Sequence, residues 1–120
     1  TVYDDYKKLL DSGKIDAVII AVPHYLHPEI AIEALKRNID YVGAHPMAGR
    51  ENKGYLYASK EVFQGANYIL IQHEENSKSA IAMMEQFVSN LGFHSVKIMS
   101  PQAHDEIISF TSQLPHVIAV

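Results

Sequence analysis

Residues 41–54 read YVGAHPMAGRENKG, and the rest of the chain can be interpreted outward from this stretch. A short apolar run at its start predicts a strand over about residues 40–44. The small residues that follow let a backbone approach a ligand closely. Pro46 fixes its own φ and favours an extended conformation at His45. We therefore expect His45 at the mouth of a strand, beside a loop with room for a small molecule. The alternative is a polar loop histidine among glycines that only form turns.

Helical and strand patterns alternate along the whole chain. Apolar, β-branched runs predict strands over residues 16–22, 67–71 and 95–99, in addition to 40–44. Amphipathic or capped segments predict helices over residues 3–12, 28–38, 55–63, 77–91 (with Asn76 or Ser77 as the cap) and 101–120. This alternation is typical of an α/β fold with a parallel or mostly parallel sheet and helices on its faces.

Composition narrows the class of protein. A chain of 120 residues supports one domain, and its net charge of −4 offers no basic surface for nucleic acid or an anionic membrane. No apolar run approaches the roughly 20 residues that a membrane helix needs. The absence of cysteine fits a cytoplasmic protein. Seven histidines are present, but His24 and His27 have no third ligand at suitable spacing, so we expect no metal site.

Two loops are expected at the carboxyl ends of strands, where open α/β sheets bind ligands. They are residues 22–27, after the first predicted strand, and residues 45–54, after the second. In the first loop, Pro23 and His27 have an alternative interpretation as a turn and a helix start.

The last predicted helix carries a polar stripe in an otherwise apolar segment. Its members are spaced i, i+4, i+7 and i+11, so that they share one face of a regular helix: Asp105, Ser109, Ser112 and His116. Pro115 removes a backbone hydrogen bond and predicts a kink beside this stripe. Such a stripe either lines a pocket or faces water, with the kink serving packing alone.

Residues 40–120 resemble the prephenate dehydrogenase family, oxidoreductases of tyrosine biosynthesis. The resemblance rests on three ordered pieces, YVGAHPMAGRENKGY, FQGANYIL and SPQAHDEIISFTSQLPHVIAV. It implies an oxidative decarboxylation of prephenate to 4-hydroxyphenylpyruvate that depends on NAD or NADP, with prephenate or arogenate as the substrate.

The same resemblance implies roles for individual residues. His45 matches the histidine of the GAHPMAG motif, which polarises or deprotonates the ring hydroxyl; a neutral histidine suits this chemistry near neutral pH. Four more positions are implied to contact the substrate: Gly49, Glu51, Ser112 and His116. Ser112 also borders the nicotinamide in the family. Gln113 stands where many relatives carry histidine.

Residues 1–39 are similar to the Gfo/Idh/MocA sugar oxidoreductases. In that family the proline after the strand lies beside the cofactor, which implies cofactor contacts at Pro23 and its neighbour Val22. The EKP motif with the catalytic lysine of that family is absent. The chain thus resembles a join between two Rossmann-type relatives near residues 38–40.

These resemblances imply one truncated, Rossmann-like nucleotide-binding domain over residues 1–120. The sequence contains no Gly-x-Gly-x-x-Gly turn, so the first glycine-rich β-α-β unit is expected to be missing. The last helix is expected to lead into a dimerisation domain and, being apolar, to mediate homo-oligomer formation. The leading hypothesis is a prephenate dehydrogenase-type enzyme with weak or no activity as this chain alone. The alternatives are a non-catalytic Rossmann-like scaffold and a sugar dehydrogenase.

Overall fold

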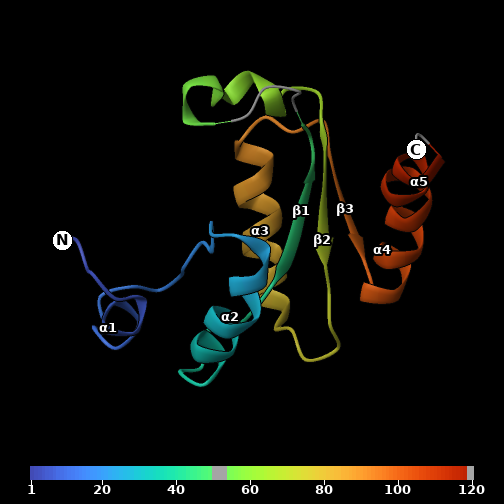
Figure 1. Cartoon of the computed structure of the whole chain (residues 1–120). Helices are drawn as coiled ribbons and strands as arrows, with labels where there is room; N and C mark the ends of the chain where they lie inside the picture. Colours follow the sequence, from blue (N-terminus) through green and yellow to red (C-terminus); the bar gives the residue numbers. More distant parts are fainter. Residues whose placement is uncertain (50–53, 119–120) are drawn as a thin grey trace. The chain divides into compact units, whose positions relative to one another are not determined.

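The computed structural model describes residues 1–49 and 54–118. It divides into two compact units, Thr1–Tyr41 and Val42–Val120, and each is considered by itself (Figure 1). The first unit contains α1 (Tyr6–Leu10), η1 (His24–Leu26) and α2 (His27–Leu35). The second contains β1 (Gly43–Met47), η2 (Tyr55–Tyr57), η3 (Lys60–Phe63), β2 (Asn67–Ile71), α3 (Lys78–Asn90), β3 (Ser95–Met99), α4 (Pro101–Ile108), η4 (Ser109–Gln113) and α5 (Leu114–Ile118).

The two α-helices of the first unit begin where the sequence offers a start signal. The Asp5 side chain accepts a hydrogen bond from the Lys7 N–H and caps α1. Pro28 lies in the first turn of α2, where a missing N–H costs nothing. Among the described residues of this unit, three apolar side chains are buried: Leu10, Ala31 and Ala34.

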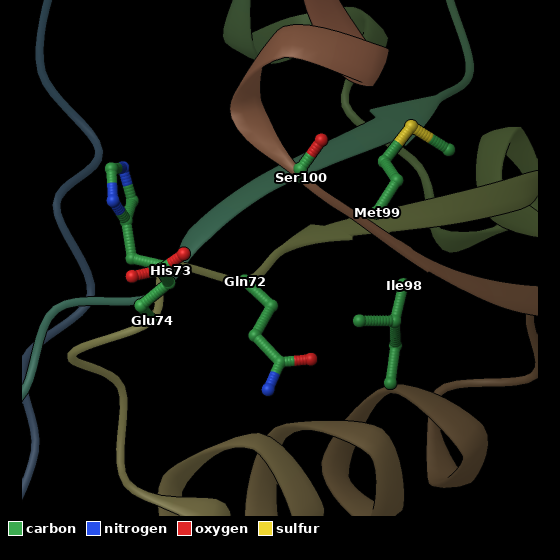
Figure 2. Close-up of a pocket in the computed structure, with 6 residues that line it drawn as sticks. All are labelled: Gln72, His73, Glu74, Ile98, Met99 and Ser100. Atoms are coloured by element: carbon green, nitrogen blue, oxygen red, sulfur yellow. The ribbon is translucent and has the colours of Figure 1, made fainter.

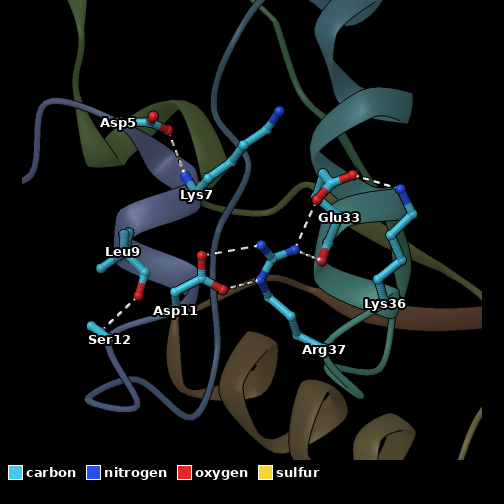
Figure 3. A network of polar contacts seen from close by, with 8 residues as sticks. All are labelled: Asp5, Lys7, Leu9, Asp11, Ser12, Glu33, Lys36 and Arg37. Atoms are coloured by element: carbon cyan, nitrogen blue, oxygen red, sulfur yellow. Dashed lines mark hydrogen bonds and ion pairs between the residues drawn. The ribbon is translucent and has the colours of Figure 1, made fainter.

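Charged side chains link the end of α1 to α2 (Figure 3). The Arg37 guanidinium donates from Nε to Asp11 Oδ1 at 2.6 Å and from an Nη atom to Glu33 Oε2 at 2.8 Å. Lys36 donates to the other Glu33 oxygen at 2.7 Å. The hydrogen bonds from Lys36 and Arg37 lower the pKa of Glu33 to about 2, and the one from Arg37 lowers the pKa of Asp11.

The strand predicted over residues 16–22 is wrong, because this run is not in any strand of the described structure. The side chain of Ile19 is 77% exposed, and that of Val22 is also exposed. A β-branched sequence favours extended backbone, but a strand also needs a neighbouring strand to accept its hydrogen bonds. No strand of the described residues supplies that neighbour to residues 16–22.

The second unit is built on a three-stranded sheet with the order β1-β2-β3. Strand β2 pairs in parallel with β3 and antiparallel with β1. Figure 1 shows α3 and α4 on opposite sides of these strands. The expected α/β fold is confirmed, but the sheet is mixed rather than mostly parallel. A parallel pair needs a long crossover, usually an α-helix, whereas the described part of the β1–β2 connection forms only short 3₁₀ helices.

The core of the second unit lies between the sheet and its helices. Leu70 on β2 and Val88 on α3 are fully buried. Further buried side chains come from β2, α3 and α4: Ile69, Ile81 and Ile108. The prediction for α3 is confirmed, including its cap, because the Ser77 side chain accepts from the Ala80 N–H.

Residues 55–63 were expected to form one helix, and this prediction is wrong. They form two 3₁₀ helices separated by extended backbone at Ala58 and Ser59. Ser59 accepts a hydrogen bond from the Glu61 N–H and so begins the second helix instead of continuing the first. None of the helices in residues 1–49 and 54–118 is both long enough and apolar enough to cross a membrane.

Candidate functional site

His45 lies in the middle of β1, directly opposite Ile69 of β2. The sequence predicted it at the mouth of a strand that ended at residue 44, and this position is wrong. Gly43 and Pro46 suggested a loop, yet both are tolerated in a strand at the edge of a sheet. The histidine is therefore held by a strand on the sheet surface, where its half-buried side chain has a fixed direction.

The backbone next to His45 is packed closely against β2. A Cβ atom added at Gly43 would lie 3.2 Å from the Ile71 Cβ and 3.3 Å from its Cδ1. Residues 43 and 45 face the same side of a strand, as do their partners Ile71 and Ile69. Glycine at position 43 therefore lets Ile71 pack beside the histidine, and this is the packing reason for the first residue of the GAHPM strand.

A second histidine, His104 of α4, contacts His45. The His45 Nδ1 and His104 Nε2 atoms lie 3.1 Å apart, and the two ring centroids are separated by 5.4 Å in an edge-on arrangement. The other ring nitrogen of His104, Nδ1, lies 3.0 Å from Asp105 Oδ1. The His104 side chain is only 15% exposed. The described structure thus joins β1 to the first turns of α4 through a row of three titratable side chains.

Sequence reasoning missed His104. It stands inside the quoted piece SPQAHDE, but it does not belong to the polar stripe that the helical spacing singled out. The signal that could have found it is its place in the first turn of a helix that begins directly after a strand, which puts it beside the sheet. The Ser100 side chain fixes that start by accepting from the Ala103 N–H.

The predicted single stripe on the last helix is wrong, because the helix is not regular. Between α4 and α5, residues Ser109–Gln113 form a π-helical turn. A π turn bonds i to i+5, so positions on either side of it no longer follow the α-helical spacing. The interruption directly precedes Leu114 and Pro115, where the proline cannot donate a backbone hydrogen bond.

The four stripe residues consequently have separate surroundings. Asp105 contacts His104, and Ser109 Oγ donates to the Glu106 carbonyl oxygen at 2.7 Å. Ser112 is half-buried in η4. The backbone of His116 belongs to α5, and its side chain lies outside the described residues.

The roles of the remaining predicted site residues stay predictions. Val22 and Pro23 belong to the first unit, where the Val22 carbonyl oxygen lies 2.7 Å from His27 Nε2. Gly49 is exposed, with open space around the position of a Cβ atom. Glu51 lies outside the described residues.

A hollow of about 280 Å³ opens at the carboxyl ends of the parallel strands β2 and β3 (Figure 2). Its lining follows both strands: Gln72, His73, Glu74, Ile98, Met99 and Ser100. Figure 2 shows the side chains of Ile98 and Met99 on opposite sides of β3. Sequence reasoning did not single out this edge, although the rule that ligands bind at carboxyl ends of strands points to it. Among residues 1–49 and 54–118, no group of three histidine, cysteine or acidic residues could hold a metal ion.

A family model described as "Prephenate dehydrogenase, nucleotide-binding domain" matches residues 27–97. The chain belongs to the prephenate dehydrogenase family. The match begins at residue 27, so the likeness to this family extends past the join expected near residues 38–40 and into the segment for which a likeness to sugar oxidoreductases was expected.

Individual relatives agree with this membership. The chain is 33% identical over 91 residues to a prephenate dehydrogenase of Bacillus subtilis (strain 168), covering 76% of this chain and 24% of the relative. It is 37% identical over 78 residues to a cyclohexadienyl dehydrogenase of Zymomonas mobilis (strain ATCC 31821 / ZM4 / CP4), covering 65% and 26%. The chain thus spans about a quarter of the length of the curated relatives it matches.

A solved structure shares the fold as well. The crystal structure of prephenate dehydrogenase from Aquifex aeolicus, in complex with hydroxyphenyl propionate and NAD+, superposes with a TM-score of 0.65. The two sequences are 29% identical, and the match covers 77% of this chain and 31% of the other. These comparisons give no support to the sugar dehydrogenase alternative.

Proposed function

We propose that this chain carries the proton-accepting part of a dehydrogenase that oxidatively decarboxylates prephenate or arogenate, with NAD or NADP as the hydride acceptor. The observation that carries the proposal is the position of His45, half-buried on the sheet and in contact with His104 at 3.1 Å. The names of the relatives support the same substrate class.

His45 suits this role for a physical reason. A neutral imidazole has one nitrogen that donates a hydrogen bond and one that accepts. Nδ1 contacts His104, and the proposal assigns to Nε2 the role of accepting from a substrate hydroxyl. An unperturbed histidine titrates near pH 6.5, which keeps the acceptor form abundant at neutral pH.

This chain does not contain the Gly-x-Gly-x-x-Gly turn that usually holds the pyrophosphate of the nicotinamide cofactor. Its six glycines stand at positions 13, 43, 49, 54, 65 and 92, and no three of them make the Gly-x-Gly-x-x-Gly turn. The proposal therefore assigns to this chain the handling of the proton and derives no hydride step. Val22, Pro23 and Ser112 remain proposed contacts of the cofactor, on the resemblance alone.

The proposed substrate contacts also rest on the resemblance alone. Gly49, Glu51, Ser112 and His116 are proposed to border the substrate on the matching family motifs. We also propose a cytoplasmic location, which the absence of cysteine supports.

The first test is a calorimetric titration of the purified chain with NAD+ and NADP+, after far-ultraviolet circular dichroism has shown that it is folded. Binding would support the proposal and lead to an assay of prephenate-dependent cofactor reduction. A folded chain that binds neither cofactor would instead support the second candidate, a non-catalytic scaffold.

Where turnover is measured, His45→Asn tests the proton acceptor. Loss of general-base catalysis typically costs about 10²- to 10⁴-fold in rate. His94→Asn is the matched control, since His94 is an exposed histidine of the same unit with no part in the His45–His104 contact. Equal turnover by the His45→Asn and His94→Asn proteins would remove His45 from the mechanism.

A further inference from the structure

Three side chains, those of Asp105, His104 and His45, form a hydrogen-bonded row. Asp105 Oδ1 lies 3.0 Å from His104 Nδ1, and His104 Nε2 lies 3.1 Å from His45 Nδ1. His104 is 15% exposed and Asp105 is 83% exposed, so the row runs from solvent to the sheet surface. Both contacts are within hydrogen-bond distance, and this constrains where the protons sit.

The proton positions follow from the chemistry of the first partner. An ionised carboxylate only accepts hydrogen bonds, so the proton of a neutral His104 lies on Nδ1. The Nε2 atom of that ring is then an acceptor, and the hydrogen bond to it must come from His45 Nδ1–H. A neutral His45 with its proton on Nδ1 has an unprotonated Nε2.

We propose that Asp105 and His104 are positioning residues that hold His45 in the Nδ1–H tautomer and present Nε2 as the accepting nitrogen. Neither residue touches the reacting atoms; they act through the histidine of β1. The catalytic consequence rests on the proposed function, because a general base must carry its lone pair on the nitrogen that faces the substrate. The tautomer itself is a property of this chain without any ligand.

The opposite arrangement gives a distinct signature. If His104 carried protons on both nitrogens, its Nε2–H would donate to His45 Nδ1, and the proton of a neutral His45 would lie on Nε2. An isolated histidine also favours the Nε2–H form. A measured Nδ1–H tautomer at His45 is therefore a specific consequence of the row.

Two-bond proton–nitrogen NMR spectra of the ¹⁵N-labelled chain distinguish the two ring nitrogens of each histidine. The spectra are recorded without ligand at a pH of about 8, above the ordinary histidine pKa of about 6.5. We expect the wild-type chain to show His45 in the Nδ1–H form, and His104→Phe to lose that preference. A wild-type His45 in the Nε2–H form, or a preference that survives His104→Phe, would overturn the proposal.

The contribution of Asp105 is tested with a matched pair on the same exposed stretch of α4. Asp105→Asn and Glu106→Gln each remove one negative charge, and only Asp105 contacts His104. We expect Asp105→Asn to reduce the Nδ1–H preference of His45 and Glu106→Gln to leave it unchanged. Equal spectra for the two variants would remove Asp105 from the row.

This experiment separates the inference from the proposed function. A chain that shows the expected His45 tautomer but binds no cofactor would support the positioning role of Asp105 and His104 and would contradict the proposed function. A chain that turns over prephenate but shows no preference for the Nδ1–H tautomer of His45 would support the proposed function and would overturn the positioning role.

Discussion

Residues 16–22 (DAVIIAV) and strand β2 (Asn67–Ile71, NYILI) have closely similar apolar, β-branched sequences, yet only the second is a strand. In the first run Ile19 is 77% exposed, whereas in β2 Leu70 is fully buried and Ile69 is 4% exposed. The difference lies outside the two segments: β2 has a neighbour on each side, β1 and β3.

This contrast shows that an apolar sequence alone does not make a strand. Whether such a run is buried in a sheet depends on neighbouring strands elsewhere in the chain. The first unit relies instead on charged contacts around Arg37 and on three small or medium buried side chains. The second unit has a sheet with a helix on each side. The following changes test whether the two units depend on these different interactions.

The largest effect is expected for Leu70→Ala. Removing a fully buried leucine side chain leaves a cavity and costs about 2–5 kcal/mol of unfolding free energy. The control is Ile19→Ala, which removes an exposed side chain and should change stability by no more than about 0.5 kcal/mol. Urea unfolding followed by circular dichroism measures both. A comparable cost for Ile19→Ala would show that residues 16–22 are buried in solution. The proposed difference between this run and β2 would then be wrong.

A smaller effect is expected for Gly43→Ala. The added Cβ would lie 3.2 Å from the Ile71 Cβ, so Ile71 must move by a few tenths of an ångström, and we expect a cost of about 1–3 kcal/mol. Gly49→Ala is the matched control, because nothing lies within 4 Å of the Cβ position there. The urea midpoints of the two variants provide the comparison. Equal midpoints would show that Ile71 moves aside without cost.

The first unit should respond to acid in a way that depends on Arg37. The folded-state pKa of Glu33 is lowered from 4.5 to about 2, so its stabilising contacts are complete above pH 4.5 and are lost as the pH falls toward about 2. Arg37→Met should reduce this loss of helical circular dichroism, and added salt should weaken the network in the wild type. Lys8→Met, which breaks the exposed Lys8–Asp4 pair, should leave the acid response unchanged. An acid response that is the same in both variants would contradict a role for Arg37.

The smallest effect on folding is expected at exposed aromatic residues, where self-association is the relevant measurement. Phe110 in the C-terminal helical segment is 66% exposed, and Tyr25 in the first unit is 79% exposed. Association through the last helix, which remains a prediction, requires that Phe110→Glu lower the average mass in sedimentation equilibrium while Tyr25→Glu does not. A monomeric wild-type chain would exclude this association.

Local signals predicted a large part of the second unit. Strands β2 and β3 lie at their predicted residues, and α3 begins after the Ser77 cap. These elements could be predicted because apolar periodicity and helix capping depend on residues that are close together in the sequence. The predicted position of β1 was wrong because its proline and glycine are typical of a loop. These residues lie in a strand because they pair with β2. The failure at residues 16–22 has the same origin, since strand pairing is not a local property.

The candidate site divides in the same way. His45 could be selected from its surroundings in the sequence, since a histidine among small residues and a proline is an unusual local pattern. The contact of His104 to His45 could not be predicted in this way, because it joins residues 59 positions apart. A helical stripe was assigned to Ser109, Ser112 and His116 on a regular period that the π turn interrupts.

The π turn at Ser109–Gln113 also affects how this segment should be compared with relatives. A π turn accommodates one more residue than an α turn and so behaves as an insertion stored within a helix. Deleting one residue there would restore a continuous α-helix without turning the backbone of Leu114–Ile118 about the helix axis, because the extra residue is accommodated within the turn itself. Two homologues that differ by a single gap in this turn would therefore present the same face of α5, although their residue numbers after the turn differ by one.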